Sequence, residues 1–238
     1  MSNLNEPVLP GKAASDYERY LRTDELLTLQ KSPDKMAHRD ELLFQTIHQT
    51  AELWLKLASF EVETAIVQID ADEIWPAVRL FRRATRCLDL VTDGTMMLEH
   101  LAPWDYHEVR RELGHGSGFD SPGFRRTHEL SPLVAQAFDG LLSRRNLDLA
   151  TLYRDSQANE DVFQLAERLL DWDQRLMQWR TIHLRLVERV IGGQVIGTQG
   201  TPVEVLGRRL DVRYFQSLWD VRNALTAEAH TSPDHPGA

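Results

Sequence analysis

The chain has 238 residues, of which 42% are hydrophobic and 26% are charged, as is ordinary for a globular protein with a substantial core. Its net charge of −9 argues against a nucleic-acid partner, because phosphate binding requires a basic surface. No apolar run reaches the roughly 18 residues needed to cross a membrane, and the first residues lack the regions of a signal peptide. The single cysteine, Cys87, excludes an internal disulfide. Together these features predict a cytoplasmic protein.

Helical periodicity dominates the first half of the chain. An N-terminal arm is expected over residues 1–15, followed by a helix over 16–29 and a polar connection over 31–39. A long helix begins near residue 40, and a further helix covers 72–98. A short helix is expected over 105–113, with its N-terminal cap within 103–105. The long helix has apolar residues at steps of three and four: Leu43, Ile47, Ala51, Trp54, Ala58, Val62 and Ile66.

Two glycine-rich segments interrupt the second half of the chain. Residues 114–123 are predicted to form a loop, and less regular helices follow over 132–153. A long helix is expected over 161–191, where Gly192 and Gly193 end it. A second flexible loop, over 197–202, leads to a final helical region that ends near Glu228. With a disordered tail over 230–238 and no predicted strands, this order predicts an all-α bundle, a single domain over 16–229.

Two histidines, His48 and His183, lie in the middle of predicted helices among apolar residues at helical spacing. A buried imidazole needs a hydrogen-bond partner, a metal or a ligand, so each is either a satisfied core residue or part of a site. His183 fits an axial haem ligand, and the absence of a Cys-x-x-Cys-His motif requires any haem to be non-covalent. His48 follows Phe44 by one helical turn and fits an acid, a base or a hydrogen-bonding group beside an aromatic wall.

A different metal site is also compatible with the spacing. His48 and Glu52 are four residues apart and can share a metal ion, as in a metal-dependent hydrolase. Glu112 and His115 provide one Glu-x-x-His motif, whereas a di-iron bundle requires two on helix interiors. The di-iron interpretation is therefore weak.

Tyr106 and Arg110 are four residues apart and share one face of the short helix. An arginine in this position is either a solvated surface charge or, beside a pocket, a clamp for a carboxylate. The loops at 116–118 and 197–200 offer backbone N–H groups at close range. Neither loop matches a phosphate-binding fingerprint, because no strand precedes it and no Gly-Lys-Ser/Thr follows.

Three ordered segments resemble the tryptophan 2,3-dioxygenase family of histidine-ligated haem enzymes: residues 40–57, the Tyr106/Arg110 pair followed by 117–119, and residues 179–192. The resemblance extends over about 16–223. It implies a helical bundle that encloses a b-type haem with ferrous iron and uses O2 as co-substrate. The implied reaction inserts both oxygen atoms across C2–C3 of the indole of L-tryptophan or a close analogue, which yields N-formylkynurenine.

The resemblance also implies roles for individual residues. His183 would be the proximal ligand of the haem iron, Ser117 would contact the cofactor, and His48 would be the catalytic residue facing the indole N–H. Tyr17 and Tyr20 match tyrosines that reach into a neighbouring subunit's site, which implies a homotetramer. A further set is expected to contact the substrate: Phe44, Tyr106, Arg110, Gly118 and Thr198.

The chain departs from the family pattern in three places. The region between Phe119 and the His183 helix is shorter, and a family tyrosine is replaced by Phe124. The family's Gly-Thr-Gly-Gly-Ser-Ser-Gly loop reads Gly-Thr-Gln-Gly-Thr-Pro over 197–202 and starts one residue later. Because that loop closes over substrate in the family, mono-oxygenation of tryptophan or a substituted tryptophan to a 2-oxindole is an alternative. A haem-binding sensor is the non-enzymatic alternative, although a sensor needs no clamp for an amino acid.

Overall fold

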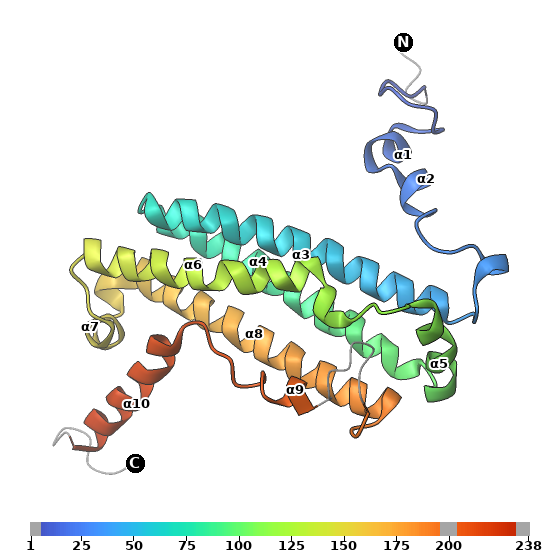
Figure 1. Ribbon diagram of the computed structural model, residues 1–238. Helices are drawn as coiled ribbons and strands as arrows, with labels where there is room; N and C mark the ends of the chain where they lie inside the picture. Colours follow the sequence, from blue (N-terminus) through green and yellow to red (C-terminus); the bar gives the residue numbers. More distant parts are fainter. Residues whose placement is uncertain (1–5, 196–203, 232–238) are drawn as a thin grey trace.

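The computed structural model describes residues 6–195 and 204–231, and every regular element in these ranges is a helix. Four long helices lie lengthwise beside one another (Figure 1): α3 (Glu41–Asp70), α4 (Ile74–Met96), α6 (Pro122–Arg144) and α8 (Glu160–Ile191). Helix α4 packs against both α3 and α8, and α6 packs against α3. The prediction of an all-α bundle is confirmed. Among the described residues, no helix combines the length and apolar character required to cross a membrane.

The shorter helices lie around this bundle. In chain order they are α1 (Asp16–Leu21), α2 (Thr23–Leu26), η1 (Pro33–Lys35), η2 (Met97–His100), α5 (Pro103–Glu112), η3 (Gly118–Asp120), α7 (Leu149–Arg154), η4 (Gln157–Asn159), α9 (Glu204–Gly207) and α10 (Gln216–Thr231). Helix α5 lies near the end of the bundle where α3 begins, whereas α1 and α2 extend away from it (Figure 1).

The main core is mostly aliphatic, with buried Phe81, Phe138 and Phe215 and one fully buried tryptophan, Trp172. The Trp172 indole N–H donates to the hydroxyl of Ser131 at 3.0 Å, and the edge of the indole meets Phe81 at 6.4 Å between ring centroids. Its only polar group is thereby satisfied, as a buried indole requires. A second, smaller apolar cluster lies apart from this core and contains Leu98, Leu186 and Val190, packed with Leu43, Phe44, Ile47, Tyr106 and Ile191.

The predicted helix over 16–29 is divided in two, which corrects the sequence-based boundary. Arg22 has a left-handed backbone conformation (φ 54°) that ends α1 and precedes α2. Neither helix buries a residue, so no packing holds the segment in a continuous helix. The predicted cap within 103–105 was also wrong, because α5 begins at Pro103 after Ala102, which makes no side-chain cap.

The second half of the segment 114–123, which was predicted to be a loop, is helical in the structure. Residues Gly118–Asp120 form a 3-10 turn, and α6 begins at Pro122 rather than near residue 132. The hydroxyl of Ser121 accepts the N–H of Phe124 at 3.2 Å, and a proline is tolerated in the first turn because its missing N–H is not needed there. Pro132 lies inside the same continuous helix, so the predicted start of helix near this residue was wrong.

The C-terminal segment is held against α8 by one buried carboxylate. Asp173 accepts the N–H groups of Tyr214 at 2.9 Å and Phe215 at 3.2 Å, and the indole N–H of Trp219 at 3.0 Å. Helix α8 ends at Gly192 (φ 91°) as predicted, and α10 continues through Thr231 into the predicted tail. The loop over 197–202, with Thr198, and residues 232–238 lie outside the described residues.

Candidate active site

A cavity of about 980 Å³ lies where α3, α5, α8 and the segment 116–121 meet. This volume is at the upper end of the range typical for small-molecule sites. Its lining includes seven of the residues predicted from the sequence: Phe44, His48, Tyr106, Arg110, Ser117, Gly118 and His183. Four separate segments supply these residues, so the fold brings together positions that are up to 139 residues apart (183 − 44).

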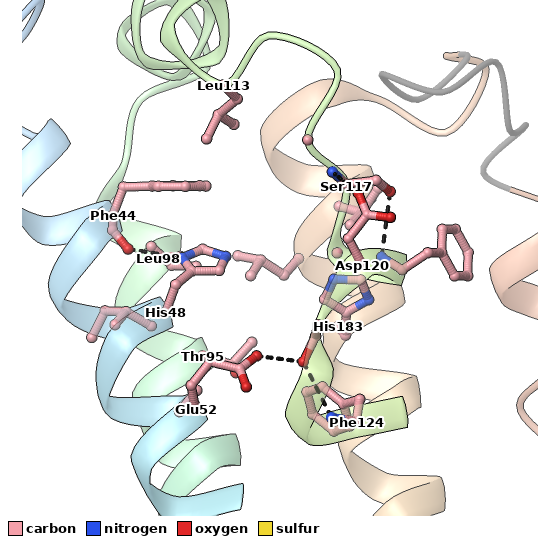
Figure 2. A pocket seen from close by; sticks show the side chains of 18 of the residues that line it. Phe44, His48, Glu52, Thr95, Leu98, Leu113, Ser117, Asp120, Phe124 and His183 are labelled. Atoms are coloured by element: carbon pink, nitrogen blue, oxygen red, sulfur yellow. Dashed lines mark hydrogen bonds between the residues drawn. The ribbon is translucent and has the colours of Figure 1, made fainter. Parts of the chain in front are cut away.

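His48 is a hydrogen-bond acceptor toward the cavity. Its Nδ1 lies 2.7 Å from the carbonyl oxygen of Phe44, and because a carbonyl only accepts, Nδ1 must carry the proton. Burial lowers the pKa of His48, so the ring is neutral at pH 7 and Nε2 keeps its lone pair. The ring is accessible because it faces the cavity, where Figure 2 shows it on the α3 side of the pocket.

His183 faces the same cavity from α8 (Figure 2). Burial, with a smaller contribution from the nearby His48, lowers the pKa of His183 to about 4. A neutral imidazole is the form that binds iron. Among the described residues, neither ring nitrogen of His183 has a hydrogen-bond partner.

One wall of the cavity is aromatic and basic. The rings of Phe44 and His48 are 4.0 Å apart at their centroids with a 30° interplanar angle, and Tyr106 lies 6.2 Å from Phe44. Burial raises the pKa of Tyr106, while the charge of Arg110 one turn later opposes that shift. The wall therefore presents a flat apolar face beside a guanidinium group.

Ser117 and Gly118 lie on the segment that enters the cavity between α5 and α6. The Ser117 hydroxyl accepts the N–H of Phe119 at 3.3 Å, and the Ser117 N–H donates to the Asp120 carboxylate at 2.9 Å. This reciprocal cap fixes the η3 turn, on which Gly118 lies. A Cβ added at Gly118 would meet no atom within 4 Å.

The alternative metal site at His48 and Glu52 finds no support in the described residues. The carboxylate of Glu52 accepts the Ser121 hydroxyl and, at 2.9 Å, the N–H of Gly123. The group of three potential metal ligands found in the described residues is instead His38, Asp40 and Asp105, which contains neither residue. In that group the His38 ring lies 3.9 Å from the Asp40 carboxylate and 3.8 Å from the Asp105 carboxylate, which connects the start of α3 to α5.

Two predicted site residues in the described part of the chain do not line the cavity. Tyr17 and Tyr20 lie on α1, where their exposed fractions are 68% and 78%, and neither lines the cavity. Thr198 lies outside the described residues.

A cationic region of the cavity wall was not predicted from the sequence. Arg180 is 7% exposed and donates from Nη1 to the carbonyl of Val212 at 2.9 Å, while its buried Nη2 has no hydrogen-bond partner of good geometry among the described residues. His128 Nδ1 is hydrogen-bonded to the hydroxyl of Tyr214, and burial with the charges of Arg180 and Arg209 lowers the pKa of His128 to about 4. One signal was available, since Arg180 precedes His183 by one turn on a largely apolar helix face.

Comparison with known proteins identifies the family. The family model described as "Tryptophan 2,3-dioxygenase" matches residues 3–131 and 133–225. The chain is 31% identical to the tryptophan 2,3-dioxygenase of Myxococcus xanthus (88% of this chain and 89% of that protein), and 32% identical to that of Bacillus thuringiensis subsp. konkukian (88% and 92%). It is also 32% identical to that of Exiguobacterium sibiricum (94% and 98%). The chain therefore belongs to the tryptophan 2,3-dioxygenase family, a family of oxidoreductase enzymes.

Proposed function

We propose that the protein is a haem-dependent oxygenase that inserts O2 into the indole ring of L-tryptophan or a close analogue, giving N-formylkynurenine by C2–C3 cleavage. One observation carries this proposal most directly. A neutral histidine with an accepting nitrogen, His48, and a second neutral histidine, His183, line one cavity from different helices. A guanidinium group, Arg110, lies on the same wall as His48.

The residues present fit a b-type haem. His183 offers a neutral nitrogen, and Leu98, Leu186 and Val190 supply an apolar surface on which a porphyrin can rest. The Nη2 of Arg180, which has no hydrogen-bond partner in the described part of the chain, is a buried donor on the cavity wall, suited to a propionate carboxylate. When bound, ferrous haem supplies the iron at which dioxygen is activated for attack on the electron-rich indole.

In this proposal His48 orients the indole. Its Nε2 accepts a hydrogen bond from the indole N–H, while its Nδ1 remains bound to the Phe44 carbonyl. The Phe44 ring, which lies tilted beside the His48 ring, forms an apolar wall for the indole and excludes water from one face. His48 does not need to remove a proton for this role.

The amino-acid part of the substrate is assigned to the residues of α5 and η3. Arg110 binds the carboxylate by two parallel hydrogen bonds, with Tyr106 beside it. Gly118 offers its backbone N–H at the same end of the cavity, and Ser117, which fixes that turn, lies beside the cofactor. Thr198 contacts the substrate ammonium group, as the family resemblance implies.

The N-terminal helices are proposed to complete a neighbouring site. Tyr17 and Tyr20 are largely exposed on α1, and α1 and α2 bury none of their residues within the chain. We assign these tyrosines to the active site of a second copy within a homotetramer, located in the cytoplasm. Residues 1–15 form the arm and 16–229 the single oxygenase domain of each subunit.

Mono-oxygenation to a 2-oxindole is the second candidate reaction. It is favoured by the sequence of the loop over 197–202, which has glutamine, threonine and proline where the family has glycine and serine. A loop that closes less completely over substrate would let the reaction end after one oxygen transfer.

Product mass after reaction of the reduced, haem-loaded protein with L-tryptophan and 18O2 separates these outcomes. Two labelled oxygen atoms are expected, whereas one would establish the 2-oxindole reaction. A haem-loaded protein that gives no product with L-tryptophan or substituted tryptophans would indicate the sensor. His183→Ala is the control, because it should abolish the Soret band that appears on haem addition; no Soret band in the unaltered protein would overturn the haem assignment.

A further inference from the structure

A continuous set of contacts connects the helix of His48 to His183. It begins at Glu52, which lies on α3 one turn after His48. The Glu52 carboxylate accepts hydrogen bonds from the Ser121 hydroxyl and, at 2.9 Å, from the N–H of Gly123. The Ser121 hydroxyl in turn caps the first turn of α6 by accepting the N–H of Phe124 at 3.2 Å. Glu52 therefore fixes the start of α6, and with it Phe124, relative to α3 (Figure 2).

The same contacts continue into α8 through stacked rings. Phe124 stacks on Trp179 with 3.7 Å between ring centroids and a 29° interplanar angle. Trp179 lies nearly parallel to the His183 ring, at 5.0 Å and 15°. The Trp179 indole N–H donates to the Thr95 hydroxyl on α4 at 3.4 Å. The indole is thus held from two sides, by Phe124 on one face and by Thr95 at its edge.

His183 lacks the usual means of fixing a metal-binding histidine. Such a histidine normally donates its second ring N–H to a carboxylate or carbonyl, which sets the ring orientation. Among the described residues the His183 ring has no such partner, and its closest aromatic neighbour is the parallel Trp179 indole. The orientation of the ring about its χ angles must then come from packing.

We propose that Trp179 is a positioning residue for His183, and that Glu52 sets the position of Trp179 through Ser121 and Phe124. The stack is a property of the protein alone, and only its consequence for iron ligation rests on the function proposed above. The contact between α3 and α6 leaves little room for adjustment, because a Cβ at Gly123 would lie 2.6 Å from the Leu55 Cβ and 2.7 Å from a Glu52 carboxylate oxygen. Movement of Glu52 is therefore expected to be transmitted to α6.

The first test uses the apoprotein. NMR resonances of the His183 ring protons, assigned with His183→Gln, should shift in Trp179→Leu because the ring current of the indole is lost. They should shift less in Trp179→Phe, which retains a stacked ring and serves if the leucine variant does not fold. Unchanged resonances in Trp179→Leu would overturn the positioning role, whether or not the protein binds haem.

The second test addresses Glu52 with a matched control. Glu52→Gln should shift the His183 resonances and, in the ferrous haem-loaded protein, move or broaden the iron–histidine stretching band. Glu63→Gln should do neither, although Glu63 also connects α3 to α6 through an exposed ion pair with Arg126 at 2.7 Å. If Glu52→Gln and Glu63→Gln behave alike, Glu52 has no specific role in positioning His183. If the NMR shifts occur but no iron–histidine band exists, the positioning role survives and the proposed ligation fails.

Discussion

The tautomer of His48 has a direct consequence for the pH dependence of the proposed reaction. Burial lowers the pKa of His48 below 6.5, the usual histidine value. The accepting Nε2 therefore stays unprotonated when the pH falls to 6.5. We expect kcat/KM for L-tryptophan to stay constant down through this value and to fall only in more acidic solution, where Nε2 gains a proton.

His48→Ala should raise Kd for L-tryptophan roughly 2- to 13-fold, the equivalent of one hydrogen bond. The affinity for 1-methyltryptophan, which has no indole N–H, should change less; equal losses for both substrates would contradict the assigned hydrogen bond.

Arg110 offers a second test at a single residue. Arg110→Ala should raise Kd for L-tryptophan about 10- to 150-fold, because a charge-assisted hydrogen bond contributes about 1.5–3 kcal/mol. Arg111→Ala is the matched control, since the Arg111 guanidinium is exposed and pairs with Glu108 at 2.8 Å. Titration of both variants with L-tryptophan and tryptamine measures the effect. An equal loss for tryptamine, which has no carboxylate, would refute the clamp.

Two glycines near the cavity differ sharply in the space around them. Gly123→Ala would place a Cβ 2.6 Å from the Leu55 Cβ, so we expect a loss of about 1–3 kcal/mol in the free energy of unfolding. Gly118→Ala meets no atom within 4 Å and should leave stability within about 0.5 kcal/mol. Chemical denaturation of both variants checks the pair, and similar midpoints would show that α6 can move away from α3.

The residues of the site were predictable in type but not in their hydrogen bonds. His48, Phe44 and Arg110 were found from helical spacing and family resemblance, and all three line the cavity. The role of Glu52 could not be found this way, because its partners lie 69 and 71 positions away. Helical spacing reports which residues share a face, whereas a long-range hydrogen bond depends on how two helices meet.

At the level of the elements, the long helices α3, α4 and α8 follow directly from apolar periodicity. Helix α6 was missed over its first ten residues because Pro122, Gly123 and Pro132 are typical of loops. Each has a different explanation in the structure: Pro122 occupies the first turn, Gly123 permits close contact with α3, and Pro132 is tolerated inside a packed helix. Tertiary packing therefore overrides local propensity here.

The Asp173 carboxylate on α8 is one of the contacts that attach α10 to the bundle, and it can be removed by a single substitution. Asp173→Ala would leave the N–H groups of Tyr214, Phe215 and Trp219 without their acceptor, so we expect a loss of about 2–4 kcal/mol in unfolding free energy. In Asp173→Ala, hydrogen exchange should speed up more in α10 than in α3, relative to the unaltered protein. Asp171→Ala is the control, because Asp171 only forms a half-exposed ion pair with Arg168 at 2.7 Å. Uniformly faster exchange throughout the bundle would argue that Asp173 does not act on α10 specifically.

For the whole molecule, buried neutral histidines predict a loss of stability in acid. The pKa of His128 is lowered to about 4, so between this value and the ordinary 6.5 the unfolded chain binds more protons than the folded one. The stabilising contribution is complete above about pH 6.5 and is lost as the pH falls toward 4. His128→Gln should reduce this pH-dependent loss by on the order of 2 kcal/mol. Urea denaturation of the apoprotein across this range measures it, and identical pH profiles would contradict the lowered pKa.

The shape of the molecule separates the N-terminal helices from the bundle. Lys31 marks the junction, where its ammonium group pairs with Glu41 at 2.6 Å and Glu112 at 2.8 Å. Glu41 is buried, so this ion pair is partly shielded from salt and holds the start of α3 close to α5. Before this junction, α1 and α2 bury none of their residues within the chain, whereas Leu29, just ahead of Lys31, already lines the cavity.

Cys87 is the only thiol of the chain, and it is buried in α4. Burial and the nearby Glu61 raise the pKa of its thiol, so it reacts slowly with alkylating reagents. A cysteine introduced at Tyr17 on α1 would consequently be the dominant labelling site in the native protein. In the proposed haem-loaded oligomer, the relaxation rate of a spin label there would report how near each N-terminal helix comes to the paramagnetic iron of its own subunit and of its neighbour.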